Sequence, residues 1–245
     1  MQDDLLHAQA SVDWAAAQLQ PFQLRLNAWS KANINVSIKE LPPDVPNNLI
    51  VATEKEALPL SFQVEAGAYL NAIRSSLDIL AVTLAQRHCP ALVDDAYFPM
   101  ASSYDAFTCW NYKGHKFVKA LPTEIRDIIE DLAPYKGGNK TLYALHHLDI
   151  VRKHVRLLSV VIQPMRLGIR LEALKHFEPL SIPWMRSSNE ETVLGLLRKD
   201  APDPQLNFTA TVCVNETAYM TGMEIVPALR QFAILANSII GSFDM

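Results

Sequence analysis

The chain has 245 residues, of which 49% are hydrophobic and 20% are charged, and its formal net charge is -4. This composition is ordinary for a soluble protein with a sizeable core, and the slightly negative charge gives no overall attraction to nucleic acid or to an anionic membrane. The first residues are acidic, where a secretory signal is basic, and no run approaches about 18 uncharged apolar residues. We therefore expect a cytoplasmic protein without a membrane partner.

The three cysteines, Cys89, Cys109 and Cys213, are widely spaced and form no CxxC motif. An odd number at such spacings argues against a disulfide framework and against a zinc ribbon. We expect all three to be small core residues.

The first 90 residues contain both helical and strand patterns. Pro21 lies inside a run of apolar residues spaced three and four apart, and it predicts a kink or two consecutive helices because it removes one backbone donor. Proline-rich segments then flank two stretches that read as strands. The predicted elements are a helix over 4–32, strands over 34–38 and 49–53, and a second helix from about Leu60 to about Arg87.

The second of these helices carries one narrow polar stripe. At 100° per residue, Asn71, Arg74 and Asp78 share one face. The other positions are largely apolar, and the core stripe consists of Leu70, Ile73, Leu77, Leu80 and Leu84. Such a helix crosses the middle of a domain, and its buried charges need partners, which Arg74 and Asp78 can provide for each other at i,i+4.

Residues 90–121 show no sustained period and predict an ordered irregular connection. Its aromatic residues favour a hydrophobic lid over the bundle rather than stacking on bases: Tyr97, Phe98, Phe107, Trp110, Tyr112 and Phe117. A short helix is expected to open around Pro122 and to end before Pro134. Asn139 is then the predicted N-cap of a helix that runs to about Val161.

The helix over 141–161 has faces of different character. Its apolar side consists of Leu148, Val151, Val155 and Leu158. Its polar side consists of His146, Asp149, Lys153 and Arg156, with His147 and His154 between the two sides. Because buried polar groups must be paired, we expect this helix to pack beside the helix of Arg74, with Asp78 in hydrogen-bonding reach of Lys153 or His154.

From residue 165 onward an apolar period of two predicts an antiparallel sheet with one solvated face. The expected strands are around 167–171, 180–184, 192–197 and 208–214. A last helix has Pro227 in its first turn. Because helices and strands are segregated, the predicted fold is α+β, a helical bundle with a small antiparallel sheet in a single domain over 1–245. The helical part covers about 1–33, 60–162 and 223–245, and the sheet part about 34–54 and 164–217.

The sequence lacks a Walker motif, GxGxxG and GxSxG, so neither a nucleotide-dependent enzyme nor a serine hydrolase is indicated. His147 and His154 are roughly 10 Å apart along a helix, which is too far for one ion. His146 and Asp149 could chelate together, but no set of three ligands is visible, so we predict no metal and no cofactor. Basic residues could seat a phosphate at a helix N-terminus or form a solvated face: Lys136, Lys140, Arg152, Lys153 and Arg156.

Two stretches resemble signatures of a widespread group of uncharacterised bacterial proteins. Residues 70–81, LNAIRSSLDILA, are similar to the group's signature hNLRSALDHLA, and residues 151–157, VRKHVRL, are similar to its signature IDKHRLL. In that group the first signature contains Arg-x4-His, which is similar to the motif of HEPN domains. The resemblance implies a HEPN-like helical bundle, a homodimer and, as in many HEPN domains, metal-independent cleavage of RNA. Apolar surface on the first and last helices also favours a homodimer through the bundle.

Two departures from these signatures bear on catalysis. Ile79 stands where the HEPN-like motif has histidine, and Arg152 stands where the second signature has aspartate. In a metal-independent ribonuclease the histidine moves protons and the arginine stabilises charge on the phosphate. Isoleucine cannot transfer a proton. Arg74 therefore matches the arginine of the motif, while His154, from the facing helix, is the candidate that replaces its histidine. The candidate catalytic residues are Arg74, Asp78 and His154, and the candidate binding residues are Asn71, His146, His147, Asp149, Lys153 and Arg156.

Three functions remain open. The first is RNA binding or a degenerate ribonuclease, which requires a basic cleft containing both Arg74 and His154. The second is a non-catalytic structural or partner-binding module, in which a dry, fully paired seam fixes the register of the helices. The third is a small-molecule sensor that uses the cleft between bundle and sheet.

Overall fold

The computed structural model describes residues 3–244 except 110, 181–190, 217–219 and 221. Its helices are η1 (Asp3–Leu5), α1 (Leu6–Asn33), α2 (Leu60–His88), η2 (Pro90–Asp95), α3 (Tyr104–Thr108), α4 (Lys113–Ala120), α5 (Thr123–Asp131), α6 (Lys140–His154), α7 (Leu171–Leu174) and α8 (Ile225–Gly241). Its strands are β1 (Ile34–Lys39), β2 (Asn47–Glu54), β3 (Val160–Gly168), β4 (Phe177–Pro179), β5 (Thr192–Arg198) and β6 (Asn207–Val214).

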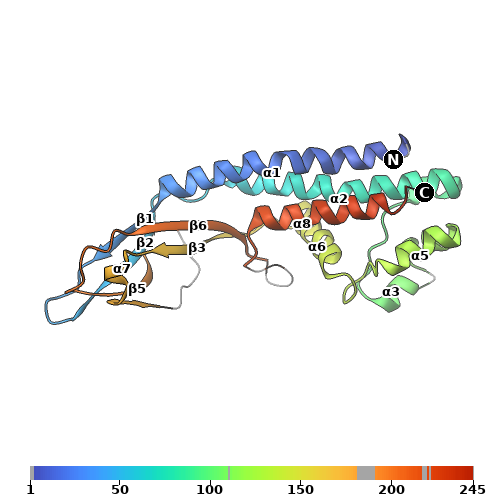
Figure 1. Cartoon of the computed structure of the whole chain (residues 1–245). Helices are drawn as coiled ribbons and strands as arrows, with labels where there is room; N and C mark the ends of the chain where they lie inside the picture. The colour runs from blue at the N-terminus through green and yellow to red at the C-terminus, as the bar shows by residue number, and fades with distance from the viewer. Residues whose placement is uncertain (1–2, 110, 181–190, 217–219, 221, 245) are drawn as a thin grey trace.

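The molecule is elongated, with α1, α2 and α8 side by side and the strands gathered at one end (Figure 1). The helix α6 packs against α2 and α8, while α3 and α5 lie away from the strands. The α+β class predicted from the sequence is therefore confirmed, as helices in a bundle and small antiparallel sheets.

The helix α1 shows how burial overrides a local breaker. Its apolar positions at spacings of three and four are at most 3% exposed: Ala8, Val12, Ala15, Leu19, Phe22 and Leu26. Pro21 lies on the exposed side of one continuous helix, so of the two expected outcomes, a kink or two consecutive helices, the second is wrong. A proline inside a helix costs about 3 kcal/mol, which the buried stripe on both sides of it outweighs.

The predicted core stripe of α2 is confirmed. Leu70, Ile73, Leu77, Leu80 and Leu84 are all 0% exposed, and the helix begins and ends within one residue of the predicted bounds. With α1 on one side and α8 on another, α2 has few exposed positions. Any polar group on its inner faces therefore has to find a partner within the protein.

The strands form two antiparallel sheets instead of the single sheet expected. One has the order β1-β2-β5-β4 and the other pairs β3 with β6. Leu171 lies in the short helix α7 and not in a strand, and residues 181–184 of the predicted strand lie outside the described residues. Between the sheets is a second, smaller apolar cluster that consists of Ile50, Ala52, Ile162, Leu194 and Leu197.

The connection over 90–121 is more regular than expected, because it contains η2, α3 and α4. Its packing agrees with the prediction: Phe98, Phe107 and Phe117 are at most 4% exposed and belong to the main core. Trp110 lies outside the described residues. The connection therefore acts as a packed lid on one side of α2 and α6.

The helix α6 ends earlier than the sequence suggested. Asn139 caps it as predicted, because its side-chain oxygen accepts a hydrogen bond from the Leu142 N–H. The helix stops at His154 instead of Val161, since residues from Val160 onward pair with β6. Val155, expected on the apolar side, is 70% exposed.

Two further expectations are only partly met. Cys213 is buried, but Cys109 is exposed and Cys89 is half-buried, so the cysteines are not all core residues. The apolar stripes of α1 and α8 pack inside the chain, so only part of the apolar surface that favours a homodimer is left. The large apolar side chains of these two helices that stay exposed are Leu6, Trp14, Leu24 and Ile234. The homodimer stays a prediction. None of the helices in the described part of the chain has the length and apolar character needed to cross a membrane.

Candidate functional site

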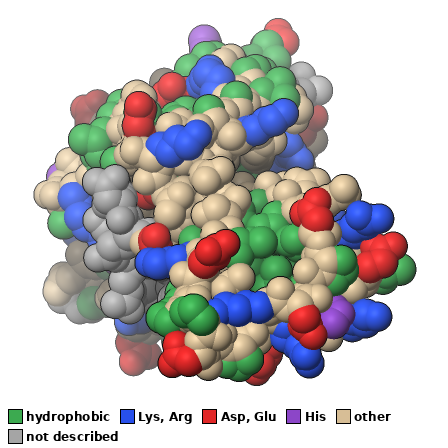
Figure 2. Space-filling model, turned by 90° about the vertical axis from the view of Figure 1, so that its left-hand side faces the viewer, with side chains coloured by type: hydrophobic (Ala, Val, Ile, Leu, Met, Phe, Trp, Pro, Cys, Tyr) green, Lys and Arg blue, Asp and Glu red, His purple; other side chains and the backbone are tan. Residues whose placement is uncertain are grey.

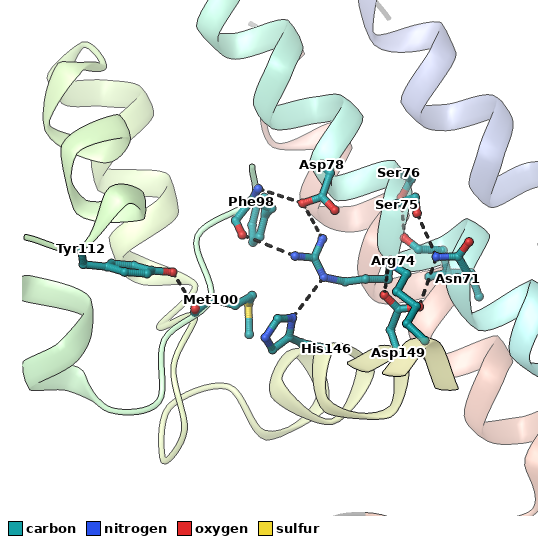
Figure 3. A network of polar contacts seen from close by, with 12 residues as sticks. Asn71, Arg74, Ser75, Ser76, Asp78, Phe98, Met100, Tyr112, His146 and Asp149 are labelled. Atoms are coloured by element: carbon teal, nitrogen blue, oxygen red, sulfur yellow. Dashed lines mark hydrogen bonds and ion pairs between the residues drawn. The ribbon is translucent and has the colours of Figure 1, made fainter. Parts of the chain in front are cut away.

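The polar stripes of α2 and α6 face each other, as predicted, across a seam in which the two helices run antiparallel. Asn71 of α2 bonds to Asp149 of α6, and Arg74 of α2 bonds to His146 of α6. Going three residues forward along α2 therefore means going three residues back along α6. We call Asn71, Arg74, Asp78, His146 and Asp149 the polar seam (Figure 3).

Arg74 is the centre of the seam. Its side chain is 5% exposed, and each of its three guanidinium nitrogens has a partner. Nη1 donates to Asp78 Oδ1 at 2.8 Å, Nη2 to the Phe98 carbonyl at 3.5 Å and Nε to His146 Nδ1 at 3.5 Å. The guanidinium therefore joins α2, the lid and α6, and its charge is met mainly by Asp78.

The lid is held in place where it meets Arg74. The Phe98 N–H donates to Asp78 Oδ1 at 3.0 Å, so that one carboxylate oxygen bonds to both Arg74 and the lid. Further along, Tyr112 donates to the Met100 carbonyl at 2.5 Å, and burial raises the pKa of Tyr112. Ala101 bridges to Tyr135 through backbone hydrogen bonds with the neighbouring residues. These bonds fix the Phe98 carbonyl that Arg74 needs.

His146 is uncharged in this environment. Burial, together with the positive charge of Arg74, lowers the pKa of His146 from 6.5 to about 4. Since Nδ1 accepts from Arg74, the neutral ring carries its proton on Nε2. At neutral pH His146 therefore accepts a hydrogen bond from Arg74 and does not act as a charged proton donor.

Asp149 organises the other half of the seam. It is 3% exposed, and its Oδ1 accepts from Asn71 Nδ2 at 3.2 Å. The Lys153 ammonium lies 2.6 Å from Oδ2, and Arg152 Nε lies 3.6 Å from Oδ1. Asn71 also bonds to the Ser75 hydroxyl at 3.2 Å. The buried carboxylate is thus fully paired, and Lys153 is its ion-pair partner.

The predicted meeting of Asp78 with Lys153 or His154 is wrong. Because α2 and α6 are antiparallel, the C-terminal turn of α6 lies beside Gly67 and not beside Asp78: an added Gly67 Cβ would be 2.6 Å from Arg152 Cδ. His154 is the exposed last residue of α6, eight residues and so about 12 Å along the axis from His146. Arg74 and His154 therefore do not form one site.

Other predicted binding residues also have separate partners. Arg156 forms a two-pronged ion pair with buried Glu216, at 2.7 and 3.0 Å, and this pairing raises the pKa of Arg156. His147 stacks on Tyr143, with ring centroids 6.5 Å apart. The basic residues do not gather at one helix N-terminus either, because Lys140 begins α6 while Arg152 and Lys153 lie in its last turn.

Sequence reasoning missed two participants. Phe98 contributes through its backbone, which no side-chain pattern can reveal. His7, at the start of α1, lines a cavity of about 620 Å³ together with Asp78 and Ile79. Asp78 Oδ2 makes no hydrogen bond to a described residue, and its side chain is 37% exposed. Non-local packing of α1 on α2 brings His7 there, so the signal was not available from local sequence.

The residues that the structure describes include no group of three or more His, Cys, Asp or Glu side chains placed to hold a metal ion. Comparison of the chain with known protein families, with curated proteins and with solved structures gives no match. The resemblance to HEPN domains therefore stays a prediction.

Proposed function

We propose that this chain is a non-catalytic binding protein in which the polar seam fixes the packing of α2, α6 and the lid. The observation that carries the proposal is the pairing of Arg74, whose three nitrogens all bond within the protein while the side chain is 5% exposed. A phosphate-binding arginine must offer its donors to the substrate. Three of the five N–H groups of Arg74 already donate to α6, to the lid and to Asp78, and because the side chain is 5% exposed it presents little of the guanidinium to a substrate.

The charge pattern supports the same proposal. Lys and Arg side chains lie among Asp and Glu at the strand end of the molecule (Figure 2). In the sheets and their loops, Lys39, Arg170 and Arg198 pair with Glu191, Glu172 and Asp200. Binding to nucleic acid relies on many cations that are free to neutralise phosphates, and the pairing of these three leaves fewer of them, which favours protein or small ligands over RNA.

A second candidate, metal-independent RNA cleavage, is favoured by one observation. His7 and the half-exposed carboxylate of Asp78 line the same cavity, beside Ile79. An imidazole and a carboxylate facing one space are the groups that general acid-base catalysis uses. In this alternative His7, and not His154, takes the part of the missing histidine.

The test is incubation of the purified full-length chain with end-labelled single-stranded RNA in the presence of a chelator. The proposal predicts no cleavage and no gel shift, for the unchanged chain and for Arg74→Ala, His7→Ala and His154→Ala alike. Cleavage that falls by about 10²-fold or more in His7→Ala, with His154→Ala as the matched exposed-histidine control, would establish the second candidate instead.

A further inference from the structure

A cleft of about 620 Å³ lies where the helical part meets the two-stranded sheet. Residues in the C-terminal half of α1 form one wall, and residues 207–211 of β6 form the other. The α1 residues that line it are spaced as one helical face: Gln23, Asn27, Ser30 and Lys31. Ile34 of β1, Arg166 of β3 and Glu224, just before α8, complete the lining.

The β6 wall of this cleft includes an open strand edge. β6 pairs with β3 along one edge, and on the other edge Val214 bonds to Gly222 and Met223 through its carbonyl and its N–H, at 3.0 and 2.8 Å. The backbone N–H and C=O groups of alternate residues point to the same edge of a strand. Those of Ala210 and Phe208 therefore point to the same edge as those of Val214, away from β3. Within the described residues, no other strand or loop bonds to Ala210 or Phe208 on that edge.

The polar side chains around this edge are also available. The side chains of five lining residues make no hydrogen bond or ion pair with any described residue: Ser30, Lys31, Arg166, Asn207 and Thr209. Two of the five are cations. The acidic member of the lining, Glu224, instead accepts a hydrogen bond from the Thr211 hydroxyl at 3.0 Å. The cleft therefore combines unpaired main-chain groups with two unneutralised positive charges.

We propose that this cleft binds an extended acidic peptide segment of a partner protein, which adds to β6 as a further strand and turns a carboxylate toward Lys31 and Arg166. Main-chain hydrogen bonds to Ala210 and Phe208 supply the pairing, as in other cases of strand addition, and the carboxylate supplies the selectivity. A small anion would neutralise the cations but leave the edge unpaired. The inference rests on the proposed binding role and names the class of partner.

The first arm of the test uses a labelled, blocked octapeptide of alternating Val and Glu, with fluorescence anisotropy on the full-length chain. We expect saturable binding that weakens as salt is added, and a Val-Lys octapeptide that binds at least about tenfold more weakly. The double variant Lys31→Ala/Arg166→Ala should lose about tenfold in affinity for the acidic peptide. Lys175→Ala, which removes an exposed lysine outside the cleft, should leave binding unchanged.

The second arm tests the strand edge itself. In Ala210→Pro the lost N–H is one that points to the cleft and not to β3, and proline is tolerated at such edge positions, so the fold should survive while peptide binding is lost. If this variant does not fold, the affinity of the double variant Lys31→Ala/Arg166→Ala for the acidic peptide still tests the proposal.

Four results would overturn the proposal. They are no binding of the acidic octapeptide at about 1 mM, equal binding of the acidic and basic octapeptides, competition by free glutamate as strong as by the octapeptide, and unchanged binding in a folded Ala210→Pro. A dimer of this chain that dissociates in Ala210→Pro would assign the edge to a second copy instead. None of these results depends on the RNA assay, which tests the proposed function separately.

Discussion

The hydrogen bond from Arg74 to His146 determines which form the imidazole takes. Nδ1 must keep its lone pair to accept from Nε of Arg74, and a second positive charge beside the guanidinium is unfavourable. In the unfolded chain these constraints are absent, so His146 there binds a proton more readily. The folded and unfolded states thus differ in protonation between the two pKa values.

This difference predicts a loss of stability in acid. Because the folded pKa of His146 lies at about 4, below the usual 6.5, the unfolded state takes up more protons as the pH falls from about 6.5 to about 4. The contribution of His146 is fully present above pH 6.5 and disappears through this window. The variant His146→Asn keeps an acceptor but does not titrate. Between pH 7 and pH 4.5 we expect its melting temperature to fall by about 4 °C less than that of the unchanged chain. An identical decrease in both proteins would contradict the neutral-histidine assignment.

The residue-level sequence predictions succeeded where the partners lie on one helix. The ion pair between Arg74 and Asp78 follows from helical spacing, and it is present at 2.8 Å. Which residue lies beside His154 depends on the direction of α6 and on its position along α2. The periodicity of the sequence carries no information about either. The roles of Phe98 and His7 arise from the lid and from α1, so their place in the site depends on long-range packing.

At the scale of elements, one close contact between α2 and α6 depends on a glycine. Gly67 is buried, and an added Cβ would lie 2.6 Å from Cδ and 2.9 Å from Cγ of Arg152. The Arg152 stem thus occupies the space that any larger residue at position 67 would need. This contact sets the separation of the two helices beside the Asp149 end of the seam.

A double-mutant cycle can measure this contact. Gly67→Ala alone should destabilise the chain by about 1 to 3 kcal/mol because the added methyl group overlaps the Arg152 stem. In the background of Arg152→Ala the same change should stabilise it by about 0.5 to 1 kcal/mol, since alanine is the better helix former. The measurement is urea unfolding of the four proteins. The same sign for Gly67→Ala in both backgrounds would show that the stem and the glycine do not compete for space.

Element bounds could be predicted where an apolar period meets a clear stop, as for α2 and α5. They could not be predicted where pairing with a distant strand decides. Leu158 and Val161 continue the helical spacing of α6, yet the segment from Val160 joins β6, which lies about fifty residues further along the chain. The division into two sheets has the same origin, because strand partners are chosen by non-local packing.

For the whole molecule, the long helices are held together at the end away from the strands. Arg87 of α2 pairs with Asp4, before α1, and donates to the Phe243 carbonyl, after α8, at 3.4 Å. The seam joins α2 to α6 and the lid further along the same helix. Because α2 takes part in every one of these connections, the fold depends on it more than on any other single element, as its central apolar stripe suggested.

The central claim is that Arg74 serves the fold, and the free energy of unfolding of Arg74→Ala tests it most directly. Removing this side chain leaves Asp78, the Phe98 carbonyl and His146 without their common partner, so we expect a loss of about 2 to 4 kcal/mol in urea unfolding. The matched control is Arg198→Ala, which removes an exposed pair with Asp200 and should change the stability far less, because solvent screens that pair. If Arg74→Ala is as stable as the control, or more stable than the unchanged chain, Arg74 is not a structural centre and the claim fails.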